Sequence, residues 1–171
     1  MTPDWPQQLY QLLKRQGIRQ VSLVPDAGHA QLIRLCEADR DLQVVRLTTE
    51  EEGVALAVGA WLGGDKSVLL MQSSGAGNCI NMLSVLAVCQ VPLVMFVTMR
   101  GEWSEFNPWQ VPMGHATQGV LEQLGVLVSR ADRAEDVADT AAGALRIAYN
   151  TLRPAAVLIG QRVLGAKDFK D

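Results

Sequence analysis

Three consecutive carboxylates, Glu50 to Glu52, stand directly before a segment of unusually small residues. The helix dipole favours acidic side chains in a first helical turn, so these residues could simply begin a helix. The segment contains Gly53 and Gly59, and each glycine costs up to about 1 kcal/mol in a helix interior. The pattern therefore indicates a helix that a neighbouring helix or chain approaches closely, with a carboxyl available for proton transfer.

A glycine-rich turn, Gln-Ser-Ser-Gly-Ala-Gly-Asn, follows a strongly apolar run and spans residues 72–78. Backbone N–H groups in such a turn could cradle a phosphate. The Gly-Lys-Ser/Thr ending of a nucleotide P-loop is missing, and Gly-x-Gly also fits a mere tight turn. On the residues alone, both interpretations stay open.

Two further segments carry groups that titrate or bind anions. Asp26 follows the first apolar run and could handle a proton, or only cap a turn or helix. His115 ends a long segment, residues 98–115, and could pass protons near neutral pH or be an exposed loop histidine. Arg100 could bind an anionic substrate group or pair with Glu102.

Alternating apolar runs and helical patterns must position these residues. Strands that are apolar throughout indicate a parallel sheet covered on both faces, so we expect a three-layer α/β domain of about six strands spanning residues 1–171. Ligands gather at the carboxyl ends of such strands, where the segments above lie. The expected strands are 21–24, 42–47, 67–71, 92–97, 126–128 and 155–159, and the expected helices are 5–16, 28–38, 51–62, 77–88, 117–124 and 133–150, with 100–114 irregular.

Composition argues against several functions. The net charge is -3 and no basic stripe exists, so nucleic acid is not an expected partner. No stretch reaches the roughly 18 apolar residues that span a membrane, and the N-terminus lacks a secretory pattern. Cys36, Cys79 and Cys89 have no metal-site spacing. We expect them to be buried free thiols of a cytoplasmic protein.

Together, the motifs resemble the pyrimidine-binding domain of thiamin-diphosphate enzymes, and especially the sulfopyruvate and phosphonopyruvate decarboxylases. Glu51, Gly53 and Gly59 match the spacing of the glutamate helix of that family. The resemblance covers residue 21 to about residue 125, and its motifs occur in the same order as in the family. It implies the thiamin-diphosphate-binding fold. The other matching stretches are Val24-Pro25-Asp26, Gln72-Ser73-Ser74-Gly75, Gly77-Asn78, Arg100-Gly101-Glu102 and Gln110-Val111-Pro112-Met113-Gly114.

This resemblance implies a role for residues of each loop. Glu51 would bond the aminopyrimidine of the cofactor and so promote loss of the thiazolium C2 proton. Asp26 and His115 would complete the catalytic set by handling protons near the substrate, whereas Glu50 and Glu52 would be capping or surface acids. Further cofactor contacts would come from Pro25, Gln72, Ser73, Ser74, Gly75 and Asn78, and substrate contacts from His29, Arg100 and Gln110.

The Gly-Asp-Gly motif with which the family binds its metal is missing, because the Gly-Asp pair at 64–65 is followed by lysine. The resemblance then implies a beta subunit that carries this motif and holds the diphosphate through Mg²⁺, in a hetero-oligomer that shares the cofactor. No metal site is expected on this chain. The implied reaction converts sulfopyruvate, or a similar anionic 2-oxo acid, to an aldehyde and CO₂. Trp103, Phe106 and Trp109 depart from the expected pattern or line a larger pocket.

Other functions stay compatible with the sequence. The complete enzyme could be a carboligase, or could decarboxylate an ordinary 2-oxo acid. The chain could also be a binding partner that has lost catalysis, although the retained Glu51, Asp26 and His115 argue against this. An unrelated flavodoxin-like domain would leave the glycine-rich helix unexplained.

Overall fold

The strands form one parallel sheet. The computed structural model describes residues 4–166. In this part of the chain, six strands run in the order β2-β1-β3-β4-β6-β5, and each neighbouring pair is parallel. The sheet predicted from the apolar runs is thereby confirmed. Its strands are β1 (Ile18–Leu23), β2 (Gln43–Arg46), β3 (Lys66–Gln72), β4 (Val94–Thr98), β5 (Leu127–Ala131) and β6 (Ala155–Ile159).

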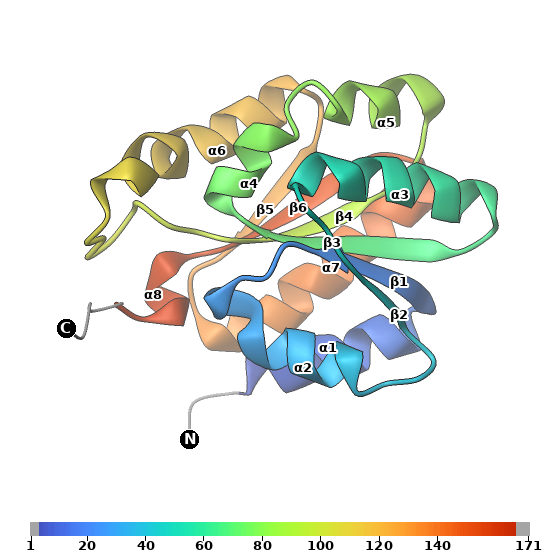
Figure 1. Cartoon of the computed structure of the whole chain (residues 1–171), viewed down its shortest axis with the longest axis horizontal. Helices are drawn as coiled ribbons and strands as arrows, with labels where there is room; N and C mark the ends of the chain where they lie inside the picture. Colours follow the sequence, from blue (N-terminus) through green and yellow to red (C-terminus); the bar gives the residue numbers. More distant parts are fainter. Residues whose placement is uncertain (1–3, 167–171) are drawn as a thin grey trace.

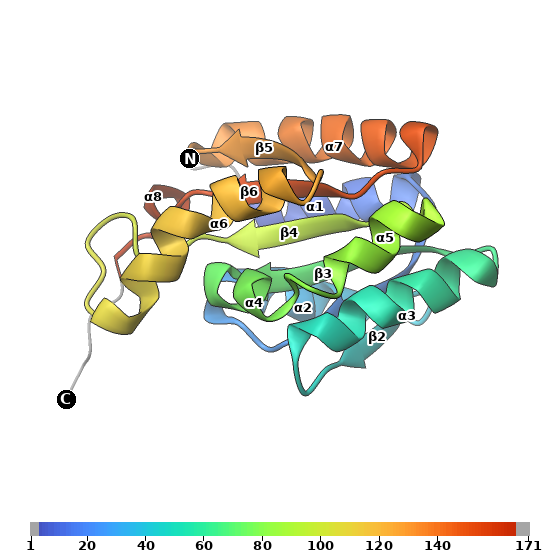
Figure 2. The ribbon, with the colours of Figure 1, turned by 90° about the horizontal axis from the view of Figure 1, so that it is seen from above.

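Helices cover both faces of the sheet, as Figures 1 and 2 show. One face carries α1 (Trp5–Arg15), α2 (Ala30–Glu37) and α7 (Val137–Thr151), which we call the α1–α2–α7 layer. The other carries α3 (Glu50–Leu62), α4 (Ser73–Asn78), α5 (Leu83–Cys89) and α6 (Val111–Gln123), the α3–α6 layer. The short α8 (Gln161–Leu164) follows β6. Among residues 4–166, no helix combines the length and the apolar character that crossing a bilayer requires.

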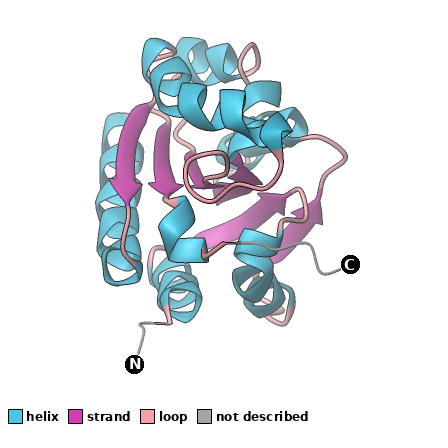
Figure 3. Cartoon of the chain, turned by 90° about the vertical axis from the view of Figure 1, so that its left-hand side faces the viewer, coloured by secondary structure: helices cyan, strands magenta, loops and turns pink. Residues whose placement is uncertain are grey.

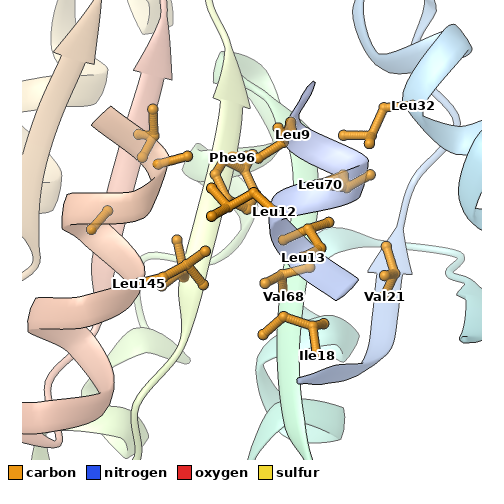
Figure 4. Packing of buried hydrophobic residues seen from close by; sticks show 14 of the residues in the cluster. Leu9, Leu12, Leu13, Ile18, Val21, Leu32, Val68, Leu70, Phe96 and Leu145 are labelled. Atoms are coloured by element: carbon orange, nitrogen blue, oxygen red, sulfur yellow. The ribbon is translucent and has the colours of Figure 1, made fainter. Parts of the chain in front are cut away.

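The central strands are buried on both sides because each layer of helices packs against one face. In β3, Val68 and Leu70 belong to the cluster under the α1–α2–α7 layer, whereas Leu69 and Met71 belong to the cluster under the α3–α6 layer. Figure 4 shows the first cluster, in which Phe96 from β4 packs with leucines of α1. This alternation explains why the strands read as continuous apolar runs.

The carboxyl ends of the central strands are aligned. Leu23 of β1 pairs with Leu70 of β3, Gln72 of β3 with Thr98 of β4, and Thr98 with Ile159 of β6. The loops that follow these strands therefore start at one edge of the sheet, which faces the viewer in Figure 3. This edge contains the four segments that the sequence predicted to bind ligands.

The backbone of α3 approaches the sheet closely at Gly53. A Cβ added there would lie 2.6 Å from Leu69 Cδ1 and 2.9 Å from Leu47 Cδ1. A Cβ added at Gly59 would meet nothing within 4 Å. The predicted close approach thus occurs inside the chain for Gly53, whereas Gly59 is exposed.

Three local predictions were wrong. The helix expected over 77–88 is two helices, because α4 begins already at Ser73 and consists of small residues without apolar periodicity. The segment expected to be irregular contains the start of α6 at Val111, where Pro112 fits a first helical turn. Cys89 is exposed at the end of α5, whereas Cys36 and Cys79 are buried free thiols as predicted.

Candidate functional site

The turn after β1 carries a buried carboxylate. Asp26 lies against the end of β4, where the Thr98 hydroxyl donates a hydrogen bond to Asp26 Oδ2. Nδ1 of His29 is 3.4 Å from the same oxygen. Burial alone would raise the pKa of Asp26, but His29 and Thr98 outweigh it and hold that pKa below its usual range. Asp26 is therefore an ionised carboxylate with a fixed orientation.

His29 lies behind Asp26 and is fully buried. Its ring meets Trp5 edge to face, with 6.5 Å between the ring centroids and an interplanar angle of 72°. Neither ring nitrogen has a well-formed hydrogen bond within the described protein. The substrate contact that the sequence predicts for His29 stays a prediction; within the described chain its ring lies against Asp26 and Trp5.

The three glutamates at the start of α3 have different surroundings. Glu52 completes a capping box and accepts a hydrogen bond from the backbone N–H of Thr48 at 2.8 Å, so its predicted capping role is confirmed. Glu50 is only 7% exposed and accepts a hydrogen bond from the Asn78 side-chain amide at 2.9 Å. The expectation that Glu50 caps the helix or lies at the surface is therefore wrong. Glu51 is exposed, and its carboxylate has no side-chain partner among the described residues.

One residue of the glycine-rich turn after β3 forms a hydrogen bond to the loop after β4. Ser73 is fully buried, and its Oγ accepts a hydrogen bond from the backbone N–H of Arg100 at 3.1 Å. This contact connects the loops after β3 and β4. Oε1 of Gln72 is buried without a hydrogen-bond partner in the described chain, so it is available to a ligand. Ser74 is half-buried, and Pro25 across the edge is exposed.

One ion pair orders the segment after β4. Nε and Nη2 of Arg100 donate to Glu105 at 2.7 and 2.5 Å. Gly101 N–H and the Gln161 amide donate to the same carboxylate at 3.1 and 2.9 Å. Arg100, together with these donors, lowers the pKa of Glu105 to about 2. Arg100 thus pairs with Glu105 and not with Glu102, and an anionic substrate would have to displace this carboxylate.

A cleft of about 580 Å³ lies beside this segment, and His115 of α6 lines it. Glu102 and Arg130 form a paired contact on the wall of the cleft, with two oxygen–nitrogen distances of 2.7 Å. The guanidinium of Arg162 lies 4.8 Å from the centre of the Trp103 ring. His115 itself is exposed and has no ion pair within the described chain. The cleft therefore presents a titratable group among side chains whose charges are largely balanced.

The other aromatic residues of the segment face outward. Trp109 is 84% exposed and forms an apolar groove with Met113 and neighbouring residues. A Cβ added at Gly77 would lie 3.1 Å from Met113 Sδ, so this groove adjoins α4. Phe106 is also exposed. Gln110, predicted to bind substrate, has a buried Oε1 without a partner in the described chain.

Sequence reasoning missed several residues of this edge. Thr98 was not selected, although a polar residue at the end of an apolar strand is a usable signal. Glu105 and Gln161 gave no local signal, because their contact joins positions 56 residues apart. Of the predicted residues, the structure joins Asp26 with His29, Ser73 with Arg100, and Asn78 with Glu50. Glu51 and His115 are exposed and enter none of these contacts.

Comparison with known sequences identifies clear relatives. Residues 5–126 match the family described as thiamine pyrophosphate enzyme, N-terminal TPP binding domain. The sulfopyruvate decarboxylase subunit alpha of Methanococcus maripaludis is 32% identical over 152 residues, which cover 88% of this chain and 91% of the relative. The subunit of the same name from Methanothermobacter thermautotrophicus is 36% identical over 127 residues, covering 74% of this chain and 77% of the relative. A phosphonopyruvate decarboxylase of Streptomyces viridochromogenes is 35% identical over 108 residues, 62% of this chain and 27% of the relative.

Solved structures share the fold. A thiamine diphosphate-dependent 4-hydroxybenzoylformate decarboxylase of Rhodococcus jostii superposes with a TM-score of 0.77 at 20% identity, covering 98% of this chain and 31% of that one. A 2-oxoglutarate:ferredoxin oxidoreductase of Magnetococcus marinus gives 0.76 at 16% identity, covering 94% and 29%. This chain thus spans about a third of each of these larger proteins.

Proposed function

This chain belongs to the family of thiamine pyrophosphate enzymes, as their N-terminal TPP binding domain, and we propose that it is the alpha subunit of a two-chain 2-oxo-acid decarboxylase. The observation that carries the proposal is the exposed carboxylate of Glu51. It lies in the first turn of α3, at the carboxyl edge of the sheet, and has no side-chain partner within the described chain. An unpartnered acid at this edge is available to a ligand that a second chain brings.

The residues present fit thiamin diphosphate. Gln72 Oε1 is a buried acceptor without a partner in the described chain, and Ser74, two residues later, is half-buried. With Glu51, these side chains offer a carboxyl and polar groups for an aminopyrimidine, and the exposed Pro25 adds an apolar surface. Gly75 is buried, so its proposed cofactor contact would require the Glu50 side chain that fills its Cβ position to move. When bound, the cofactor supplies the nucleophilic carbon and the electron sink that decarboxylation of a 2-oxo acid requires. The residues of this chain hold it and move protons.

Each catalytic residue has a distinct proposed task. Glu51 exchanges a proton with a ring nitrogen of the cofactor. Asp26, kept ionised by His29 and Thr98, orients groups of the substrate and accepts hydrogen bonds from them. His115, exposed on the cleft wall, supplies the proton that completes the aldehyde product. Gln110 contacts the substrate. Arg100 also contacts it, but only after the substrate has displaced the Glu105 carboxylate from Arg100.

The outer face of α3 supports a partner chain. Ala55, Gly59 and Leu62 are exposed, and they follow Glu51 at helical spacing. Val88 of α5 adds an apolar side chain that is 82% exposed. Such a surface fits a beta subunit that binds the diphosphate through Mg²⁺ and a Gly-Asp-Gly motif, in a hetero-oligomer that encloses the cofactor. The free thiols fit the reducing cytoplasm as the location.

The substrate proposed is sulfopyruvate or a similar anionic 2-oxo acid, with the aldehyde and CO₂ as products. The test uses the chain purified with its partner from the native cell, supplied with thiamin diphosphate and Mg²⁺. We expect Glu51→Gln to lower kcat for CO₂ release by about 100-fold or more, because the amide cannot exchange the proton. Full activity of this variant would refute the assignment. A condensed product in place of an aldehyde would identify a carboligase.

A further inference from the structure

We propose that Thr98 is a positioning residue for the proposed reaction, because its hydroxyl holds the Asp26 carboxylate in place at the carboxyl edge of the sheet. The inference rests on the proposed function, which assigns the binding of substrate groups to Asp26. It concerns the last residue of β4, which the sequence did not select as a site residue.

The side chain of Asp26 bonds to a distant strand and not to its own turn. Asp26 stands in the N-cap position of the short 3-10 helix Ala27–His29, but its side chain makes no capping hydrogen bond there. Its Oδ2 atom instead accepts a hydrogen bond from the hydroxyl of Thr98, which lies 72 residues later in the chain. The orientation of the carboxylate is therefore set by β4.

Thr98 is a rigid support for this contact. It ends an inner strand of the sheet, where it pairs with Gln72 of β3 on one side and with Ile159 of β6 on the other. Thr98 is only 1% exposed, and its branched side chain has few rotamers open to it. The hydroxyl thus joins the turn after β1 to the middle of the sheet.

The surroundings of Thr98 fix the direction of its hydroxyl. A Cβ added at Gly28 would lie 2.8 Å from Thr98 Cγ2 and 3.0 Å from Asp26 Oδ2, so the Thr98 methyl fills the space beside this glycine. His29 Nδ1 is 3.4 Å from the same oxygen, but neither ring nitrogen of His29 has a well-formed hydrogen bond. Among residues 4–166, Thr98 is therefore the only side chain that donates a well-formed hydrogen bond to Asp26.

A comparison in two backgrounds separates positioning of Asp26 from support of the fold. Thr98→Val removes the hydroxyl and keeps the branched shape, Thr98→Ser keeps the hydroxyl, and Asp26→Ala removes the carboxylate. We would measure kcat for CO₂ release from sulfopyruvate, in the complex with the partner chain, for Thr98→Val in the natural and in the Asp26→Ala background. The carboxyl ¹³C resonance of Asp26, recorded on the full chain by itself, reports the contact without turnover.

We expect Thr98→Val to lower kcat about tenfold in the natural background and less than about twofold in Asp26→Ala, because the hydroxyl then has no carboxylate to position. Thr98→Ser should stay within about threefold of the natural kcat, since it retains the hydrogen bond. Thr117→Val is the matched control, because it removes the hydroxyl of another fully buried threonine. It should leave both kcat and the Asp26 resonance unchanged.

Equal losses of kcat in the two backgrounds would overturn the proposal, since they would show that Thr98 supports the fold and does not act through Asp26. An Asp26 resonance that stays in place in Thr98→Val, or natural activity in Asp26→Ala, would overturn it as well. If the resonance moves as expected but the natural complex releases no CO₂, the proposed function is refuted instead.

Discussion

The two helical layers of this chain differ in how many large apolar side chains they expose on their outer surfaces. In the α1–α2–α7 layer, the large apolar side chains that are exposed are Ile147 and Leu152, the residue that follows α7. On the side of the α3–α6 layer, within the described residues, they are Leu62, Ile80, Val88, Trp109 and Val111. Trp103 and Phe106 are exposed in the loop that follows β4. Both layers bury an extensive core against the sheet. The difference therefore lies in what each layer presents outward.

This contrast indicates which face is complete without a partner. Charged side chains such as Lys14 and Arg146 accompany the α1–α2–α7 layer, whereas α3 is apolar and small on nearly every side after its first turn. A helix that is apolar all round is normally buried. This contrast supports the proposal that a partner chain covers the α3–α6 layer, with the candidate site at its edge.

The largest effect should come from placing a charge on the outer surface of α3. Leu62 is 80% exposed, and Leu62→Asp should raise the Kd for the partner chain by about 100-fold or more while leaving the isolated fold intact. Ile147→Asp, on α7, is the matched control and should leave that Kd unchanged. Titration of the partner by calorimetry measures both. Equal losses in the two variants would contradict the assignment of the face.

A second prediction concerns the loop after β4, which the ion pair between Arg100 and Glu105 holds in place within this chain. The pKa of Glu105 is lowered to about 2, so its ionised form stabilises the fold fully above its ordinary pKa of 4.5 and progressively less as the pH falls toward 2. Glu105→Gln should cost on the order of 2 kcal/mol at pH 7, and the difference should shrink below about pH 4.5.

Urea unfolding at several pH values measures this effect. Glu122→Gln, in the exposed part of α6, is the control for the substitution itself and should change stability at pH 7 by no more than about 0.5 kcal/mol. A Glu105→Gln deficit that stays constant down to pH 2 would mean that the ion pair with Arg100 does not stabilise the loop.

The smallest expected effect comes from replacing one exposed glycine in each layer by alanine. Neither Gly59 on α3 nor Gly143 on α7 has an atom within 4 Å of an added Cβ. Each change to alanine should therefore stabilise the isolated chain by up to about 1 kcal/mol. In the complex, Gly59→Ala should weaken partner binding, whereas Gly143→Ala should not. If both variants bind the partner as tightly as the natural chain, no close approach occurs at Gly59.

Much of this fold was predictable because its causes are local. Apolar runs such as residues 67–71 predicted strands buried on both faces, and the rule for parallel sheets placed the candidate loops at one edge, where the structure has them. The environments of Glu50 and Glu51 were not predictable, since which of them points inward depends on how α3 is rotated against α4. For Arg100 the sequence left an anionic substrate group and Glu102 as alternative partners, whereas the fold provides Glu105, which also accepts from Gln161. Such choices are made by tertiary contacts between distant segments, which one sequence does not reveal.

The central claim is that this chain holds half of a cofactor site and that its partner completes it. The most direct measurement is CO₂ release from sulfopyruvate, with thiamin diphosphate and Mg²⁺, by this chain, by the partner and by their mixture. The account predicts activity in the mixture alone, with loss of activity when Leu62→Asp prevents assembly. Turnover by either chain alone, or an assembled mixture that binds thiamin diphosphate equally well with Glu51→Ala, would contradict it.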